Sequence, residues 1–202
     1  IHRKNMKTNI RKVAVLGSGV MGSAIACHLA NVGCSVLLLD IVPKEAEDTD
    51  NKDARNQLVN DALKASLKSK PSPIYSKSFA NRIDTGNMTD DMSKIAGCDW
   101  IIEVVVERLD IKKIVFENVE KFRTPGTLIT SNTSGIPIHT MLEGRSDDFK
   151  QHFCGSHFFN PPRYLKLLEI IPTPETKQSV VDFLMDYGSK ILGKTTVLCK
   201  DT

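Results

Sequence analysis

The sequence predicts an α/β domain whose doubly wound, mostly parallel sheet carries helices on both faces and extra strands at its C-terminal edge. Two observations predict this class. Short apolar runs alternate with segments of helical period, which is the order of elements in strand–helix–strand units. Several runs, such as 36–39 and 101–106, are almost continuously apolar, as in strands that helices cover on both faces. At 202 residues with 41% hydrophobic side chains, the chain is long enough to bury such a sheet.

The elements follow in chain order, and periodicity distinguishes helices from strands. The first helix is expected at 20–32, where apolar residues recur three, four or one apart and form one stripe. A longer polar helix is expected at 51–68; it ends before Pro71, because proline lacks an N–H and disfavours helix in the residue before it. A third helix is expected at 111–122, and a fourth has an apolar face formed by Val180, Val181, Leu184, Met185, Ile191 and Leu192. The strands are expected at 12–17, 35–40, 100–106, 127–131, 154–159, 167–172 and 195–199.

No repeat, low-complexity tract or flexible linker interrupts this series of elements. One domain is therefore expected at 10–202, preceded by an N-terminal extension at 1–9 in which Met6 is a candidate natural start. The charged residues 1–5 are not followed by the apolar segment of a secretory signal, so export is not expected.

Composition and charge argue against several classes of protein. No apolar run approaches the roughly 20 residues that a membrane-spanning helix needs, so no membrane insertion is expected. The net charge of +3 is small and the basic residues are dispersed, so no nucleic-acid partner is expected. The cysteines lack C-x-x-C spacing, which favours buried free thiols in a reducing compartment over disulfides or a metal site; they are Cys27, Cys34, Cys98, Cys154 and Cys199. A cytoplasmic protein without a bound metal is therefore expected.

A G-x-G-x-x-G motif at 17–22 directly follows the first predicted strand and opens the first helix. Its glycines permit a tight turn and backbone contact with a pyrophosphate, while the helix N-terminus supplies N–H groups. Asp40 ends the second strand, at the spacing where a carboxylate accepts hydrogen bonds from ribose hydroxyls and repels a 2′-phosphate. The sequence therefore predicts a Rossmann-type site for NAD rather than NADP. The expected contacts are Gly17, Ser18, Gly19, Val20, Met21, Gly22, Asp40 and Ile41.

His157 and Glu169 lie on neighbouring predicted strands and are candidates for general base chemistry. A carboxylate beside an imidazole fixes its tautomer and stabilises the imidazolium that forms when the ring takes a proton. On residue types alone the alternatives stay open, because a histidine next to two phenylalanines is often a core residue. His28 lies more than two turns from the phosphate end of the first helix, so it is interpreted as a packing or surface residue.

Over residues 11–202 the chain resembles the 3-hydroxyacyl-CoA dehydrogenase family, through five motifs in the family's order and spacing. They are GSGVMG at 17–22, EVVVE at 103–107, SNTS at 131–134, HFFNP at 157–161 and LEIIP at 168–172. Residues 163–166 and 192–194 are most similar to bacterial fatty-acid oxidation members, in which a hydratase-like region can follow on the same chain. The resemblance implies the N-terminal NAD-binding domain of an enzyme that oxidises (S)-3-hydroxyacyl-CoA to 3-oxoacyl-CoA in β-oxidation.

The resemblance also implies residue roles. His157 is the general base, Glu169 is its partner and Ser134 donates a hydrogen bond to the reacting oxygen. The residues implied around the cofactor are Glu107, Lys112, Asn132 and Asn160, of which Asn160, like Ser134, also faces the substrate. Among the lysines after the second strand, Lys68 is the first choice for the phosphates of CoA, ahead of Lys64 and Lys70. The alternative for these lysines is a solvated helix face.

Three departures from the family bear on these roles. Arg108 stands where a small amide residue is usual, and Gly135 replaces a second serine after Ser134. In the family, the segment 200–202 leads into a helical domain that completes the acyl pocket and usually mediates dimerisation. That domain is expected to be absent from this chain, which predicts little activity for the chain alone and a homo-oligomer for the full-length protein.

Two other functions remain as alternatives. Another NAD-linked hydroxy-acid dehydrogenase shares the glycine turn but typically relies on a lysine base, and the motif around His157 disfavours it. A non-catalytic NAD-binding or redox-sensing module retains the fold and the cofactor without turnover. An assay with acetoacetyl-CoA and NADH distinguishes these alternatives from a dehydrogenase that acts on acyl-CoA.

Overall fold

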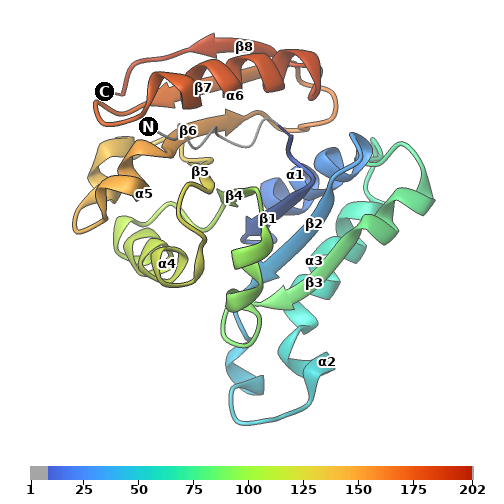
Figure 1. The fold of residues 1–202 in the computed structure, drawn as a ribbon. Coiled ribbons are helices and arrows are strands. Elements are labelled where there is room, and N and C mark those ends of the chain that lie inside the picture. The colour runs from blue at the N-terminus through green and yellow to red at the C-terminus, as the bar shows by residue number, and fades with distance from the viewer. Residues whose placement is uncertain (1–8, 202) are drawn as a thin grey trace.

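The computed structural model describes residues 9–201, so most of the expected N-terminal extension lies outside the described residues. Within the described part, one eight-stranded sheet has the order β3-β2-β1-β4-β5-β6-β7-β8 (Figure 1). Strands β1 to β6 are parallel, β7 pairs antiparallel with β6, and β8 pairs parallel with β7. The prediction of a mostly parallel sheet with extra C-terminal strands is confirmed. The strands are β1 (Lys12–Leu16), β2 (Ser35–Asp40), β3 (Ile83–Asn87), β4 (Trp100–Glu103), β5 (Leu128–Ser131), β6 (Phe153–Phe158), β7 (Leu167–Pro172) and β8 (Thr195–Leu198).

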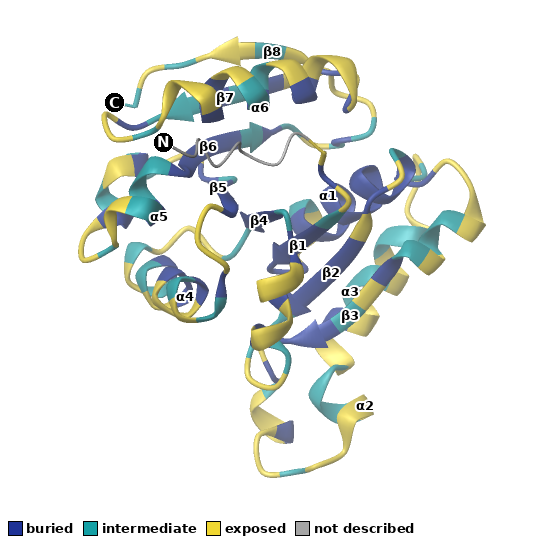
Figure 2. Cartoon of the chain, in the orientation of Figure 1, coloured by how far each residue is buried: buried dark blue, intermediate teal, exposed yellow. Residues whose placement is uncertain are grey.

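Helices cover both faces of this sheet. On one face α1, α3 and α6 share an apolar cluster with the strands, and on the other face α4, α5 and short 3-10 turns form a second cluster. The burial map shows the consequence: the central strands are buried and the outer sides of α2 and α3 are exposed (Figure 2). The helices are α1 (Val20–Asn31), α2 (Lys52–Arg55), α3 (Gln57–Lys68), α4 (Leu109–Phe122), α5 (Asp147–Gln151) and α6 (Gln178–Lys190), with 3-10 turns η1 (Lys44–Ala46), η2 (Lys77–Arg82), η3 (Met92–Gly97) and η4 (Ile138–Leu142).

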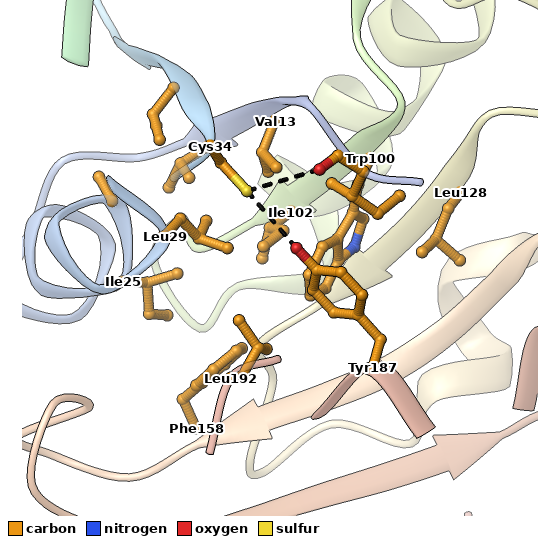
Figure 3. Close-up of a cluster of buried hydrophobic side chains, with 14 of the residues drawn as sticks. Val13, Ile25, Leu29, Cys34, Trp100, Ile102, Leu128, Phe158, Tyr187 and Leu192 are labelled. Atoms are coloured by element: carbon orange, nitrogen blue, oxygen red, sulfur yellow. Dashed lines mark hydrogen bonds between the residues drawn. The ribbon is translucent and has the colours of Figure 1, made fainter. Parts of the chain in front are cut away.

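A buried aromatic contact joins the parallel strands to the C-terminal elements. The Trp100 ring of β4 meets the Tyr187 ring of α6 edge to face, with centroids 6.1 Å apart, and the Tyr187 hydroxyl lies 3.5 Å from Cys34 Sγ (Figure 3). The Trp100 indole N–H donates to Thr130 Oγ1 at 2.9 Å, so the polar end of the ring is satisfied. One apolar cluster therefore contains residues of the parallel strands and of the C-terminal elements.

Three elements differ from the expectation, each for a local reason. The polar helix at 51–68 is two helices that meet at Asn56, because Asn51 caps α2 through the N–H groups of Asp53 and Ala54 and the chain then turns before α3 starts. The strand expected at 100–106 ends at Glu103, and just beyond this end the Glu103 carboxylate accepts a hydrogen bond from the Val105 N–H. The edge strand β3 was not expected, because only Ile83 of its five residues is apolar.

Four of the cysteines are buried as predicted, while Cys199 is half-buried. Within residues 9–201, no helix combines the length and apolar character needed to cross a bilayer. His28 is buried on α1, and its Nε2 lies 3.0 Å from the Leu192 carbonyl oxygen, which agrees with a packing role.

Candidate active site

The glycine turn connects β1 to α1 at the carboxyl edge of the parallel strands, where ligands bind in open α/β sheets. Gly17 has φ +105°, and a Cβ there would lie 2.5 Å from the Val104 carbonyl oxygen. A Cβ at Gly22 would lie 1.8 Å from the Gly17 carbonyl oxygen. A Cβ at Gly19 would meet nothing within 4 Å. Gly17 and Gly22 are therefore required by the turn itself, whereas Gly19 leaves open space above the backbone for a bound group.

Asp40 ends β2 beside this turn. Its Oδ2 accepts hydrogen bonds from the Ser18 N–H at 2.6 Å and the Ser18 hydroxyl at 2.5 Å, and its Oδ1 accepts the Ile41 N–H at 2.7 Å. The structure thus brings together the turn and the acid that the sequence singled out. The carboxylate is fixed in orientation, since three donors hold its two oxygens.

Exposed apolar side chains follow the strands at the same edge. Ile41 after β2 is 61% exposed, and Val106 after β4 is 59% exposed. Flat apolar surfaces at this edge suit an adenine ring. Val106 was missed by the sequence reasoning. Its signal is an apolar residue placed just beyond a strand end, where burial in the sheet is no longer available.

A cleft of about 450 Å³ opens between the glycine turn and α3. Gly19 and Val20 line one side, Ser66 and Lys70 another, and Asn160 a third. The cleft-lining residues of α3 are Ala62, Ala65 and Ser66, which helical spacing places on one face. Lys64 and Lys68 fall outside this face and are exposed, so Lys70 is the lysine that lines the cleft.

His157 and Glu169 are directly opposite each other in the antiparallel pair β6–β7. His157 Nδ1 lies 2.8 Å from Glu169 Oε2, and the two side chains are 18% and 30% exposed. With Nδ1 engaged, Nε2 is the ring nitrogen left to exchange a proton with a ligand. The Phe159 ring packs on the imidazole with centroids 4.4 Å apart, which restricts the ring's rotation.

Ser134 lies in the loop after β5 and is exposed. Ser134 and Glu169 line the same cleft, so the structure places Ser134 near Glu169. The N–H groups of Ser134 and Gly135 donate to Glu107 Oε1 at 3.0 and 2.7 Å. A Cβ at Gly135 would lie 3.6 Å from this oxygen, so the glycine is not imposed by crowding. Arg108 pairs with the exposed Asp110 at 2.6 Å, through side chains that are both solvent-accessible.

Lys112 and Asn132, expected beside the cofactor, direct their polar groups into the protein. The Lys112 ammonium, 1% exposed, donates to Glu103 Oε1 at 2.7 Å and to the Val105 carbonyl at 3.3 Å. Asn132 Oδ1 accepts the Phe158 N–H at 2.8 Å and so connects the end of β5 to β6. Burial raises the pKa of the Glu103 carboxyl, and the neighbouring Lys112 ammonium opposes that rise.

Glu103 was not assigned a role from the sequence. The signal was present, because a carboxylate within an apolar run of a central strand must be paired or hydrogen-bonded in the fold. Among the described residues, no group of three or more histidine, cysteine and acidic side chains is placed to hold a metal ion.

Known proteins resemble this chain along most of its length. The family model for the 3-hydroxyacyl-CoA dehydrogenase NAD binding domain matches residues 12–202. A probable 3-hydroxyacyl-CoA dehydrogenase of Bacillus subtilis is 53% identical over 98% of this chain and 26% of the relative. A putative fatty acid oxidation complex trifunctional enzyme of Rickettsia felis is 40% identical over 98% of this chain and 26% of the relative. The chain therefore spans about a quarter of the length of these two relatives.

The fold has solved counterparts. The crystal structure of 3-hydroxybutyryl-CoA dehydrogenase from Escherichia coli K12 is 31% identical to this chain, with a TM-score of 0.74. The match covers 96% of this chain and 39% of that chain.

Proposed function

The chain belongs to the family of 3-hydroxyacyl-CoA dehydrogenase NAD-binding domains, and on this premise we propose that the complete gene product oxidises (S)-3-hydroxyacyl-CoA to 3-oxoacyl-CoA in fatty-acid β-oxidation. The observation that carries the proposal is the His157–Glu169 pair, whose Nδ1 and Oε2 atoms are 2.8 Å apart, with Glu169 lining one cleft together with Ser134. The named fatty-acid oxidation relative supports the pathway.

The residues at the glycine turn fit a dinucleotide. Gly19 leaves its backbone accessible to a pyrophosphate, the N-terminus of α1 points N–H groups at it, and Asp40 lies where ribose hydroxyls are held. NAD, when bound, would accept the hydride that leaves C3 of the substrate. Ile41 and Val106 flank the adenosine end, and Asn160 lines the cleft toward the nicotinamide end.

The proton moves to His157 in this proposal. Nε2 takes the proton of the 3-hydroxyl, while Glu169 holds Nδ1–H and stabilises the imidazolium. The Ser134 hydroxyl donates to the same substrate oxygen and stabilises the negative charge that builds there. Lys70, at the rim of the 450 Å³ cleft, is the lysine best placed for a phosphate of the CoA moiety.

The rest of the gene product completes the enzyme in this proposal. We infer that the second wall of the acyl pocket and the dimer contacts come from a helical domain outside this chain, in a cytoplasmic homo-oligomer. Without that wall His157 and Glu169 face water, and the thioester is not held in a reactive geometry, which costs several kcal/mol of barrier.

An assay with acetoacetyl-CoA and NADH tests the proposal. The complete gene product is expected to oxidise NADH, whereas residues 1–202 alone are expected to bind NADH by calorimetry with little or no oxidation at matched concentration. NADH binding without turnover by the complete gene product would favour the redox-sensing alternative. Robust turnover by residues 1–202 would contradict the need for a second wall.

A further inference from the structure

We propose that Glu103 is a positioning residue for the reaction: it acts through Lys112 and Ser131 on the loop 131–135 and holds the Ser134 hydroxyl where the substrate oxygen lies. The inference rests on the proposed function, which gives Ser134 its role as donor. It concerns Glu103, a side chain that touches neither substrate nor cofactor.

The starting observation is the ion pair between Glu103 and Lys112, which is fully buried. Glu103 is 0% exposed and Lys112 is 1% exposed. Removing two charges from water is costly, and an apolar pair of similar volume would serve the stability of the core as well or better. A retained pair of this kind therefore points to a geometric requirement at this position.

The contacts around Glu103 form two arms of a hydrogen-bond network. The first arm, made of Glu103, Ser131 and Thr133, connects the ion pair to the start of the loop. Glu103 Oε2 accepts the Ser131 hydroxyl at 2.5 Å, and Ser131 Oγ lies 2.6 Å from Thr133 Oγ1. All of these side chains are buried. This arm fixes the loop on the side that precedes Ser134.

The second arm connects Glu103 to Ser134 and Gly135 through the Lys112 ammonium and the Glu107 carboxylate. Lys112 Nζ contacts Glu103 Oε1 and lies 3.5 Å from Glu107 Oε2, while Glu107 Oε1 accepts the N–H groups of Ser134 and Gly135. The Glu107 side chain is 40% exposed, so it has room to turn toward water if the buried cation does not attract it. This arm fixes the loop at Ser134 itself.

The two arms together hold the conformation of a loop that contains neither helix nor strand. Residues 132–136 are neither helix nor strand, so side-chain hydrogen bonds from the neighbouring elements decide their conformation. The Lys112 ammonium donates hydrogen bonds to Glu103 Oε1 and to the Val105 carbonyl, and Glu107 Oε2 lies 3.5 Å from it as a second carboxylate partner. The ammonium is therefore used inside the network, which assigns Lys112 a supporting role.

A double-mutant cycle in the complete gene product tests the inference. Glu103→Gln keeps the shape and removes the charge, and we expect kcat to fall by roughly 10- to 100-fold, less than the roughly 10²–10³-fold cost of deleting an oxyanion donor outright. The NADH dissociation constant is expected to stay within about twofold, because the turn at 17–22 is untouched. In the Ser134→Ala background Glu103→Gln is expected to cause no further loss.

Ser131→Ala provides a second route if Glu103→Gln folds poorly. It breaks one arm without changing charge, and its loss of kcat is also expected to vanish in the Ser134→Ala background. Asp186→Asn is the matched control, since it removes one carboxylate from the exposed Asp186–Lys190 pair on α6. This control is expected to leave kcat unchanged.

Hydrogen exchange separates failure of the inference from failure of the proposed function. The Ser134 and Gly135 amides are expected to exchange faster in Glu103→Gln while the β1 amides do not change. An equal loss of kcat from Glu103→Gln with and without Ser134 would overturn the inference. If the gene product has no turnover, unchanged exchange at Ser134 and Gly135 overturns it, whereas faster exchange supports it and only the proposed reaction fails.

Discussion

The cofactor edge and the catalytic edge of the sheet are built in different ways. The cofactor edge comes from the contiguous stretch β1, α1 and β2, and its main parts are backbone groups of the turn at 17–22 and the side chain of Asp40. The catalytic edge is assembled from residues of β4, β5, β6 and β7, which are joined by hydrogen bonds that involve at least one side chain. The turn at 17–22, Asp40 and the ends of β4, β5 and β6 all lie at the carboxyl ends of parallel strands, which share one side of a sheet.

This difference predicts which kind of substitution impairs each edge. Backbone groups of a turn cannot be deleted one at a time, so the cofactor edge is sensitive mainly to added volume. The catalytic edge depends on single polar atoms, so it is sensitive to conservative changes that leave its shape intact.

The largest effect is expected at the catalytic edge. His157→Gln in the complete gene product is expected to reduce turnover by roughly two to four orders of magnitude, because a positioned general base is lost. NADH affinity, measured by fluorescence titration, is expected to remain nearly intact, since the glycine turn and Asp40 lie on other strands. Glu169→Gln is expected to reduce turnover as well, because the amide does not support the imidazolium. Near-normal turnover of His157→Gln would remove His157 from the role of base.

Added volume distinguishes two glycines of the cofactor edge. Gly22→Ala is expected to lower the free energy of unfolding by about 1–3 kcal/mol, because its Cβ would lie 1.8 Å from the Gly17 carbonyl oxygen. Gly19→Ala is the matched control, as its Cβ would meet nothing within 4 Å. This control is expected to retain stability in urea but to weaken NADH binding, because the methyl group occupies the approach of the pyrophosphate. Equal stability of the two variants would contradict the geometry of the turn.

A buried histidine in the core behind the cofactor edge, His28, is expected to make the stability of the fold depend on pH. Burial, followed by the nearby charge of Lys194, lowers the pKa of His28 to about 4 from 6.5. Between these values the unfolded chain binds more protons than the folded chain, so stability falls as the pH drops from about 6.5 to about 4. The expected loss is about 3 kcal/mol, and none is expected from this group above pH 6.5.

Urea unfolding at several pH values checks this prediction. In His28→Gln the free energy of unfolding is expected to depend less on pH between about 4 and 6.5 than in the unmodified chain, whatever the stability of the variant. An unchanged slope would place the pH dependence of folding in other groups.

The last expected effect concerns cofactor choice. The chain is expected to bind NADH about 10- to 100-fold more tightly than NADPH, since one charge-assisted contact and one repulsion are worth about 1.5–3 kcal/mol. Asp40→Ala is expected to narrow this ratio in parallel titrations. Ser18→Ala removes a hydrogen bond at 2.5 Å but keeps the Asp40 charge, so it is expected to retain the preference. Equal affinities of the unmodified chain for both cofactors would contradict the role of Asp40.

The sequence by itself determined the fold class and the cofactor turn. Continuous apolar runs, the helix stripe at 20–32 and the glycine pattern at 17–22 are local signals, because strand burial, helical period and turn geometry act over a few consecutive residues. The proximity of Asp40 to the turn follows from strand adjacency in a βαβ unit. Strand β3 was missed because only Ile83 of its five residues is apolar, so it carries little apolar periodicity.

The tertiary structure alone decided how the catalytic edge is connected. The direct opposition of His157 and Glu169 depends on the antiparallel register of β6 and β7, in which a shift by one residue would turn one side chain to the other face. The inward direction of Lys112 and the role of Glu103 depend on β4, β5 and α4 together. That Lys70 lines the cleft, while Lys68 does not, depends on how α3 and the segment after it pack near the turn. These contacts join residues distant in sequence, and no local pattern encodes a pairing whose energy arises only when separate segments are packed.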